Sequence, residues 1–187
     1  IPNSVTSIGE EAFYNCTNLS SVTIPSNITK IERYLFYGCE NLVEVNYNAE
    51  NCSKVNDVFK NCKNLKLLNI GEGVKNIPNN AFQDCKGLTI ISIPQSVTQI
   101  GDNAFGGCGN LTEVNFNAEN CTIMGSSKKQ VFSGCVNLKT LNIGNNVKEI
   151  PSYAFSNCAS LKSVTLPASL IKIGESAFRN CSSLTSI

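Results

Sequence analysis

One pattern recurs along the whole chain: phenylalanine, followed at three-residue intervals by cysteine, leucine and another aliphatic residue. Its first copy is Phe13, Cys16, Leu19 and Val22. The other seven copies begin at Phe36, Phe59, Phe82, Phe105, Phe132, Phe155 and Phe178. Successive phenylalanines are 23 residues apart, except for one interval of 27 between the fifth and the sixth. A fixed period of this size over all 187 residues predicts a solenoid, in which each repeat forms one coil.

The apolar positions within one repeat indicate how a coil is built. The segment Leu19–Ile24 ends in an alternation of apolar and polar residues, which predicts a short strand with Val22 and Ile24 pointing inward. Pro25 follows and ends the strand, because proline lacks the amide hydrogen that a central ladder needs. Residues 10–15 carry two glutamates ahead of an apolar pair, which predicts one or two helical turns on another side of the coil.

These elements together predict an α/β repeat solenoid, a right-handed array of about eight 23-residue coils with a parallel sheet on one face. Residues 5–8 add a second, shorter extended segment to the first coil. We expect residues 1–187 to form a single solenoid domain. Solenoids normally carry polar capping repeats at their ends. Neither end of this sequence shows one, so we expect the chain to be a segment of a longer array.

The residue after each predicted strand changes in a cycle of three. From the second repeat onward the order is proline, asparagine, glycine, and then the same again: Pro25, Asn48, Gly71, Pro94, Asn117, Gly144 and Pro167. Matching segments of the two cycles are offset by 69 residues before Cys121 and by 73 residues after Phe132. We infer a duplicated cassette of three coils, with four residues inserted in the second copy around positions 125–130.

The ten cysteines follow the repeat as well. Eight of them occupy one phase of it, so each lies one layer above the last, and Cys52 and Cys121 take positions that are aliphatic in other repeats. Free cysteine packs as a small hydrophobe, which favours buried thiols. Stacked layers also bring Cα atoms within disulfide range, so pairing between neighbouring coils stays open as an alternative. With no C-x-x-C pair and no histidine, we expect no metal site.

Composition argues against several classes of function. The chain has 15 basic and 14 acidic residues without a run of like charge, so we expect no nucleic-acid partner. No apolar run approaches the roughly 18 residues of a membrane span, and we expect no membrane insertion in this segment. The absence of histidine removes the commonest general base and the triads that depend on it. We therefore predict no catalytic residues, no cofactor and no enzyme activity.

The strand segment Leu19-x-x-Val22-x-Ile24 matches the strand part of a leucine-rich repeat. The longer segment from Ile8 to Pro25 resembles the BspA-like, or Treponema-type, branch of these repeats, and units around Phe105 and Phe178 match closely. The resemblance implies a leucine-rich-repeat array. It also implies a secreted or cell-surface protein of a host-associated bacterium or a protist, with adhesion to host matrix proteins or cells as its function.

Three functional hypotheses follow. The favoured one is a non-catalytic protein-binding module whose partner is a host extracellular matrix or cell-surface protein. The alternatives are a structural spacer that carries another domain, and an intracellular scaffold for protein interactions. A full-length sequence would separate them, because a secretion signal with an anchor supports the first two and a second domain supports the spacer. The sequence leaves the oligomeric state open.

Two residues break the polar character expected of the outward sheet face. In each predicted strand the positions flanking the first inward aliphatic residue point outward, and most are small or polar. Leu67 and Ile90 are the exceptions, and we expect them to touch because they lie on adjacent strands, with Glu44 on one side and Glu113 on the other. An apolar centre with a polar rim is typical of protein-binding surfaces, although two exposed aliphatic residues are also common by chance. These four residues form the candidate site.

Overall fold

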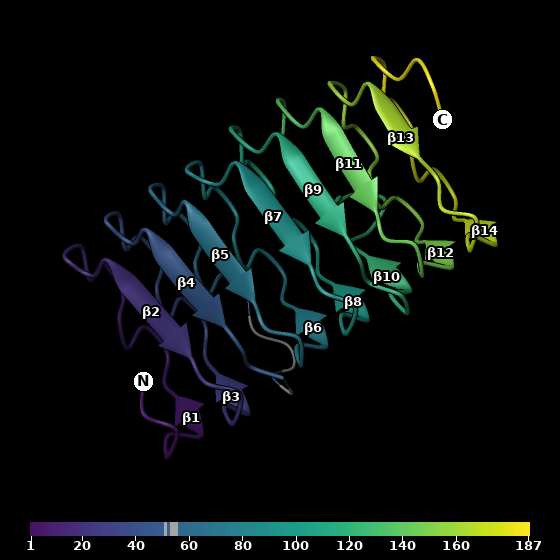
Figure 1. Ribbon diagram of the computed structural model, residues 1–187. Helices are drawn as coiled ribbons and strands as arrows, with labels where there is room; N and C mark the ends of the chain where they lie inside the picture. Colours follow the sequence, from purple (N-terminus) through teal and green to yellow (C-terminus); the bar gives the residue numbers. More distant parts are fainter. Residues whose placement is uncertain (51, 53–55) are drawn as a thin grey trace.

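The computed structural model describes residues 1–50, 52 and 56–187 as an elongated stack of coils with strands on two sides (Figure 1). The longer strands form a broad face: β2 (Ser21–Ile24), β4 (Glu44–Tyr47), β5 (Leu67–Ile70), β7 (Ile90–Ile93), β9 (Glu113–Phe116), β11 (Thr140–Ile143) and β13 (Ser163–Thr165). Two-residue strands form the second side: β1 (Ser7–Ile8), β3 (Lys30–Ile31), β6 (Asn76–Ile77), β8 (Gln99–Ile100), β10 (Ile123–Met124), β12 (Glu149–Ile150) and β14 (Lys172–Ile173).

All strand pairs are parallel, and equivalent residues of successive repeats lie opposite one another. Val45 of β4, for example, pairs with Val22 of β2 and with Leu68 of β5. The broad face consists of two hydrogen-bonded ladders, β2-β4-β5 and β7-β9-β11-β13. In the described part of the chain, β5 and β7 share no register, so the broad face is interrupted between them.

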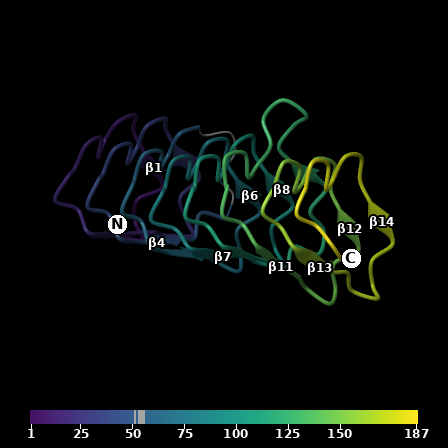
Figure 2. The ribbon, with the colours of Figure 1, turned by 90° about the horizontal axis from the view of Figure 1, so that it is seen from above.

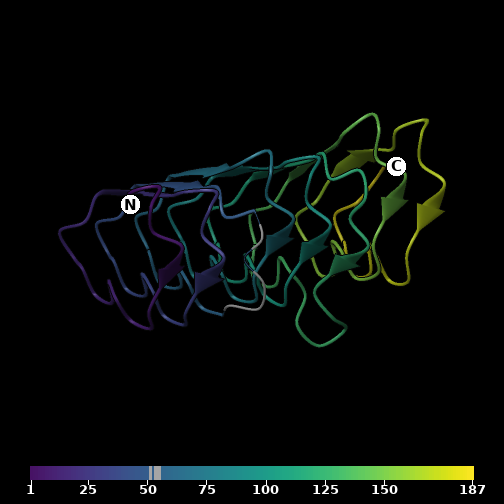
Figure 3. The same ribbon diagram turned by 90° about the horizontal axis from the view of Figure 1, so that it is seen from below.

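The second side is interrupted at a different place. Its strands pair as β1-β3, β6-β8-β10 and β12-β14. The pair β6-β8 therefore connects the two coils whose broad strands, β5 and β7, are not paired. The ladder stops between β10 and β12, where the four inserted residues lie. The loop after β10 projects beyond the other coils (Figures 2 and 3). It is closed by reciprocal backbone hydrogen bonds of 3.2 Å between Ser126 and Lys129.

Residues 10–15 form turns, and the prediction of helical turns there is wrong. Glu11 and Asn15 have φ angles of 58° and 51°, a left-handed conformation that interrupts a right-handed helix. Their amides bond to the next coil instead: Glu11 donates to the Arg33 carbonyl at 3.1 Å, and Asn15 donates to the Tyr37 carbonyl at 2.9 Å. Bonds within the coil close single turns, such as the one from the Tyr14 amide to the Glu11 carbonyl at 2.9 Å, and the described residues contain no helix. The fold is a parallel-sheet β-solenoid and not α/β.

The stack has about seven turns, fewer than the eight coils expected. Each of the first seven repeats gives the broad face a strand. The eighth pairs only through a single bridge between Ser186 and Ser163. Phe178 and Leu184 of this repeat are partly buried against the core. The last repeat therefore packs on the stack without adding a full strand.

The core is a column of repeat side chains that runs the length of the stack. Phenylalanine rings of neighbouring coils lie parallel, with centroids from 5.0 Å apart at Phe13–Phe36 to 5.7 Å at Phe155–Phe178. This spacing follows from the layer separation, since identical positions recur one coil apart. The phenylalanines of the internal repeats are almost completely buried, as are the leucines three positions after the cysteines of those repeats. No coil buries its apolar face alone, so stability depends on the neighbouring coils.

All ten cysteines are free, and nine are buried, with Cys16 partly exposed, so the prediction of buried thiols is confirmed. The repeat cysteines share a hydrogen bond. In six of the eight repeats the thiol donates to the carbonyl of the phenylalanine in the preceding coil at 3.1–3.3 Å: Cys39, Cys62, Cys85, Cys108, Cys135 and Cys181. The thiol thus fills a small space and satisfies a backbone acceptor with its weak S–H donor. Burial raises the pKa of the Cys62 thiol and raises that of Cys121 to about 12.

Packing between successive coils explains one step of the proline–asparagine–glycine cycle. A Cβ atom at Gly71 would lie 2.5 Å from the side-chain oxygen of Asn48 in the coil before it. A Cβ atom at Gly144 would lie 2.8 Å from the corresponding oxygen of Asn117. A larger residue there would displace the asparagine side chain, so an asparagine in one coil favours glycine in the next.

Candidate functional site

The broad face presents one row of outward side chains at the start of each strand. The row consists of Ser21, Glu44, Leu67, Ile90, Glu113, Thr140 and Ser163. The register places Glu44 beside Leu67 and Ile90 beside Glu113. Leu67 is 48% exposed and Ile90 is 51% exposed, whereas the residues that follow them in each strand are buried. The outward placement of these two side chains, predicted from the alternation, is confirmed.

A groove of about 460 Å³ lies between β5 and β7. Leu67 and Ile90 both line it, together with Ile70 and Pro94, so its apolar surface comes from both strands. The two side chains therefore flank a depression. The sequence predicted that the two side chains touch; this assumed that β5 and β7 pair like the other strands, which they do not, and the contact itself stays a prediction. The polar lining includes Lys66 and other residues at the two ends of the groove.

The cassette pattern accounts for one bond that is missing at this junction. At the two junctions before it, the amides of Asn48 and Gly71 each donate to the last carbonyl of the preceding strand, at 3.0 and 2.9 Å. Pro94 stands at the same place after β7 and has no amide hydrogen, so the carbonyl of Ile70 receives no such bond. The second glycine-to-proline junction, between β11 and β13, is also weakened. It keeps three register pairs, against four between β9 and β11.

The side-chain hydrogen bonds on this face stop at the same junction. On the N-terminal side, Asn69 Nδ2 donates to Asn46 Oδ1 at 2.8 Å, and Asn46 Nδ2 donates to Thr23 Oγ1 at 3.4 Å. An equivalent ladder with the same two distances runs through Asn142, Asn115 and Ser92. Among the described residues, no side-chain hydrogen bond joins Asn69 to Ser92 across the groove. Backbone and side-chain ladders therefore end together at the groove.

Two carboxylates frame the groove and are held by amides. Glu44 Oε1 accepts a hydrogen bond from Asn46 Nδ2 at 3.2 Å, and Glu113 Oε1 accepts one from Asn142 Nδ2 at 2.9 Å. Glu72 lines the groove itself. Within the described residues, none of these three glutamates forms an ion pair. The apolar lining is thus bordered by negative charge that remains available to a partner.

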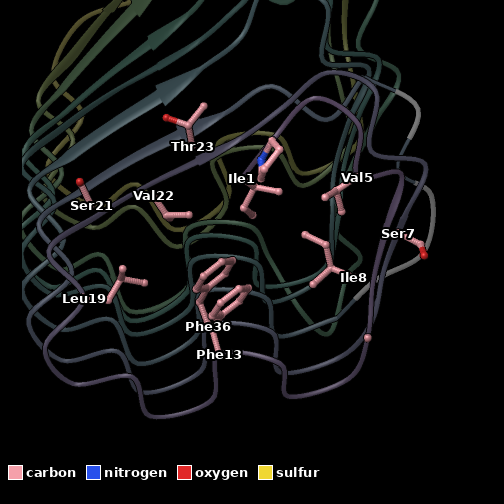
Figure 4. Close-up of a pocket in the computed structure, with 12 residues that line it drawn as sticks. Ile1, Val5, Ser7, Ile8, Phe13, Leu19, Ser21, Val22, Thr23 and Phe36 are labelled. Carbon is pink, nitrogen blue, oxygen red and sulfur yellow. The ribbon is translucent and has the colours of Figure 1, made fainter.

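Another hollow, of about 650 Å³, is of a different kind. It lies against the first coil, where the stacked rings of Phe13 and Phe36 are surrounded by aliphatic side chains such as Leu19 and Val22 (Figure 4). These repeat positions are buried in the internal coils. The hollow is therefore the uncovered end of the core column, and its shape follows from the stacking of the fold.

A third hollow, of about 480 Å³, lies on the second side, along β6, β8 and β10. Its lining is rich in amides and includes Asn56, Asn76, Asn79 and Gln99. Asn79 Oδ1 accepts a hydrogen bond from the backbone amide of Asp102 at 2.8 Å, so part of this polar surface stabilises the coil itself. Sequence analysis did not single out this surface, although several of its residues occupy equivalent positions of successive repeats, such as Asn76 and Gln99.

In the described part of the chain, no three His, Cys, Asp or Glu side chains gather in a way that could hold a metal ion. No helix among those residues is long and apolar enough to cross a membrane.

Solved structures share this fold. A leucine-rich repeat protein of T. pallidum matches with a TM-score of 0.69 and 26% identity, over 90% of this chain and 79% of that one. A leucine-rich repeat protein from Eubacterium ventriosum matches with a TM-score of 0.52 and 26% identity, over 100% of this chain and 65% of that one. One from Bacteroides ovatus matches at 0.55 and 24% identity, over 97% and 58%. A search of curated proteins found no match.

The repeat itself is also that of a known family. The family described as BspA-type leucine-rich repeat region matches in six copies, over residues 1–112 and 126–187. The unmatched residues, 113–125, include β9 and β10, and they end where the second cassette carries its insertion. The chain therefore belongs to the BspA-type leucine-rich repeat family, whose repeat regions are generally non-catalytic and typically bind proteins.

Proposed function

We propose that this chain is the protein-binding module of a secreted or cell-surface protein, and that it mediates adhesion to host matrix proteins or cells. The family supports a protein-interaction role. The observation that carries the proposal is the groove between β5 and β7, with exposed Leu67 and Ile90 on its two sides in an otherwise polar row. The candidate site is that groove with its flanking residues Glu44 and Glu113.

The groove has the physical character of a binding surface. Burying apolar side chains against a partner is the main favourable contribution to most protein association. A polar rim around an apolar centre adds specificity, because wrongly paired charges are penalised there. The interrupted backbone ladder adds a depression that a flat parallel sheet lacks. Other exposed aliphatic residues, such as Val136 and Ile171, lie outside the residues that line this groove.

The test is a double variant, Leu67→Ser with Ile90→Ser, scored for thermal stability and for adhesion to a panel of immobilised matrix proteins and to host cells. Both side chains are about half exposed, so we expect the melting temperature to stay within a few degrees and adhesion to fall. The matched control is Thr140→Ala with Ser163→Ala, at the equivalent positions of the second cassette. Adhesion that persists in the groove variant, or falls equally in both variants, would contradict the assignment.

A further inference from the structure

We propose that the groove between β5 and β7 binds an extended segment with basic, apolar and basic residues at alternate positions. An aliphatic or aromatic side chain enters the groove, and a lysine or arginine on each side reaches Glu44 and Glu113. The inference rests on the proposed function, since it names the chemistry of the partner at the same site. It follows from the order of side chains across the broad face, the spacing of the strands and the charges that the fold leaves unpaired.

The order across the face is Glu44, Leu67, the groove, Ile90 and Glu113 (Figure 1 shows β4, β5, β7 and β9 in this order). A segment that crosses the strands at right angles therefore meets negative charge, apolar surface and negative charge in turn. The arrangement is nearly symmetric about the groove, so it accepts the same pattern of side chains in either chain direction.

Strand spacing sets the length of the segment. β4 and β9 are separated by two hydrogen-bonded spacings of about 4.8 Å and by the unpaired junction between β5 and β7, so the two glutamate positions lie at least roughly 14 Å apart. An extended chain rises about 3.3 Å per residue, so residues four apart span about 13 Å. Residues at positions i, i+2 and i+4 of an extended segment also point to the same side. The two glutamates and the groove thus fit a segment of the form basic–x–apolar–x–basic.

The charges favour a basic partner. The amides of Asn46 and Asn142 orient Glu44 and Glu113, and the described residues supply no cation to either carboxylate. Glu72 adds a third negative charge at the groove, against one positive charge from Lys66. Placing like charges opposite one another is costly at an interface, so an acidic segment is disfavoured here.

The second cassette shows that the fold does not need these residues. Thr140 and Ser163 stand where the first junction has Leu67 and Ile90. They flank the other glycine-to-proline junction, which has Glu113 on one side only. The solenoid forms with small polar residues at these positions, so the apolar pair and the second glutamate are additions specific to the first junction.

The experiment titrates the isotope-labelled chain with three synthetic peptides and follows backbone amide resonances by NMR. The peptides carry Lys-Ser-Leu-Ser-Lys, Glu-Ser-Leu-Ser-Glu and Lys-Ser-Ser-Ser-Lys between glycine–serine ends. We expect only the first to shift resonances of β5 and β7 at low ionic strength. We expect its affinity to fall about two- to twentyfold in Glu44→Gln with Glu113→Gln, because each exposed ion pair contributes a factor of about 1.4 to 5. Salt at 0.5 M reduces the preference in the same way.

The matched control is Glu10→Gln with Glu11→Gln, which removes two exposed charges from the turns of the first coil and leaves binding unchanged. Equal binding of the acidic and basic peptides, or equal affinity in both glutamine variants, overturns the proposal. Resonance shifts confined to β6, β8 and β10 also overturn it. If adhesion is lost in the Leu67→Ser and Ile90→Ser variant while the peptides show no basic preference, the proposed function stands and the partner chemistry is wrong. If the chain adheres to nothing, the proposed function itself fails.

Discussion

Tyr47 is the most informative position for testing the packing of the solenoid. Its ring is 1% exposed and lies edge-on to Phe59 and Phe82, with centroids 6.4 and 6.3 Å away. Its hydroxyl is buried and has no hydrogen-bond partner among the described residues. Burial raises the pKa of this hydroxyl. The side chain therefore fills its space well but keeps a polar atom out of water without compensation.

We expect Tyr47→Phe to stabilise the chain. An unsatisfied buried polar group costs about 1–3 kcal/mol, and the change removes that group while keeping the ring. The second cassette already contains this solution: Phe116, at the equivalent position, is fully buried and lies edge-on to Phe155 with centroids 5.9 Å apart. An increase of about 1–2 kcal/mol corresponds to a rise in melting temperature of roughly 2–8 °C for a chain of this size.

The reverse change provides the matched control. Phe116→Tyr introduces a hydroxyl into the same environment and should lower stability by a similar amount. Urea unfolding followed by circular dichroism measures both changes, and the midpoints are compared directly because repeat proteins do not always unfold in one step. Destabilisation by Tyr47→Phe would show that the hydroxyl has a partner, and the account of this position would then be wrong.

Two further predictions test the stacked core and its thiols. Leu88 has packed coils on both sides, so Leu88→Ala should lower the free energy of unfolding by about 2–5 kcal/mol. Leu184→Ala, in the partly buried last repeat, should lower it distinctly less. Equal losses of stability in urea unfolding would contradict layered packing. Burial raises the pKa of Cys121 to about 12, so above about pH 9 the unfolded chain ionises this thiol first and stability falls by about 1.4 kcal/mol per pH unit. Cys121→Val should remove this one-proton contribution to the pH dependence of stability. An unchanged pH dependence above pH 9 would show that Cys121 does not contribute to it.

The repeat pattern predicted the strands and their inward faces well, because alternation in the sequence has one geometric meaning in a sheet. Val22 and Ile24 were assigned inward, and both contribute to the core. The prediction of helical turns over residues 10–15, which include Phe13, was wrong. The acidic residues and apolar pair of this segment are compatible with a helical turn, but Glu11 adopts a positive φ angle and its amide bonds to the next coil. The local sequence cannot predict a hydrogen bond that forms only between stacked coils.

The groove shows how a site can be partly visible in a sequence. The apolar pair Leu67 and Ile90 stood out because the neighbouring outward positions are polar. The depression between them was not predicted, since it depends on whether β5 and β7 pair, and Gly71 followed by Pro94 looked like one more step of a cycle. The signal was present in the chain, because a proline after a strand removes a donor. Whether the missing donor is accompanied by a groove depends on how all the neighbouring strands pair, which the local sequence does not show.

Duplication gives this solenoid two junctions of the same kind with different surfaces. At the first junction the ladder is absent and an apolar pair lies between two glutamates; at the second, three register pairs remain and the pair is Thr140 and Ser163. The second side is bonded at both junctions, because β6 pairs with β8 beside the first and β12 pairs with β14 beside the second. The coils at the groove are thus bonded on the far side and open on the near side, which allows a depression in the binding face without loss of the stack.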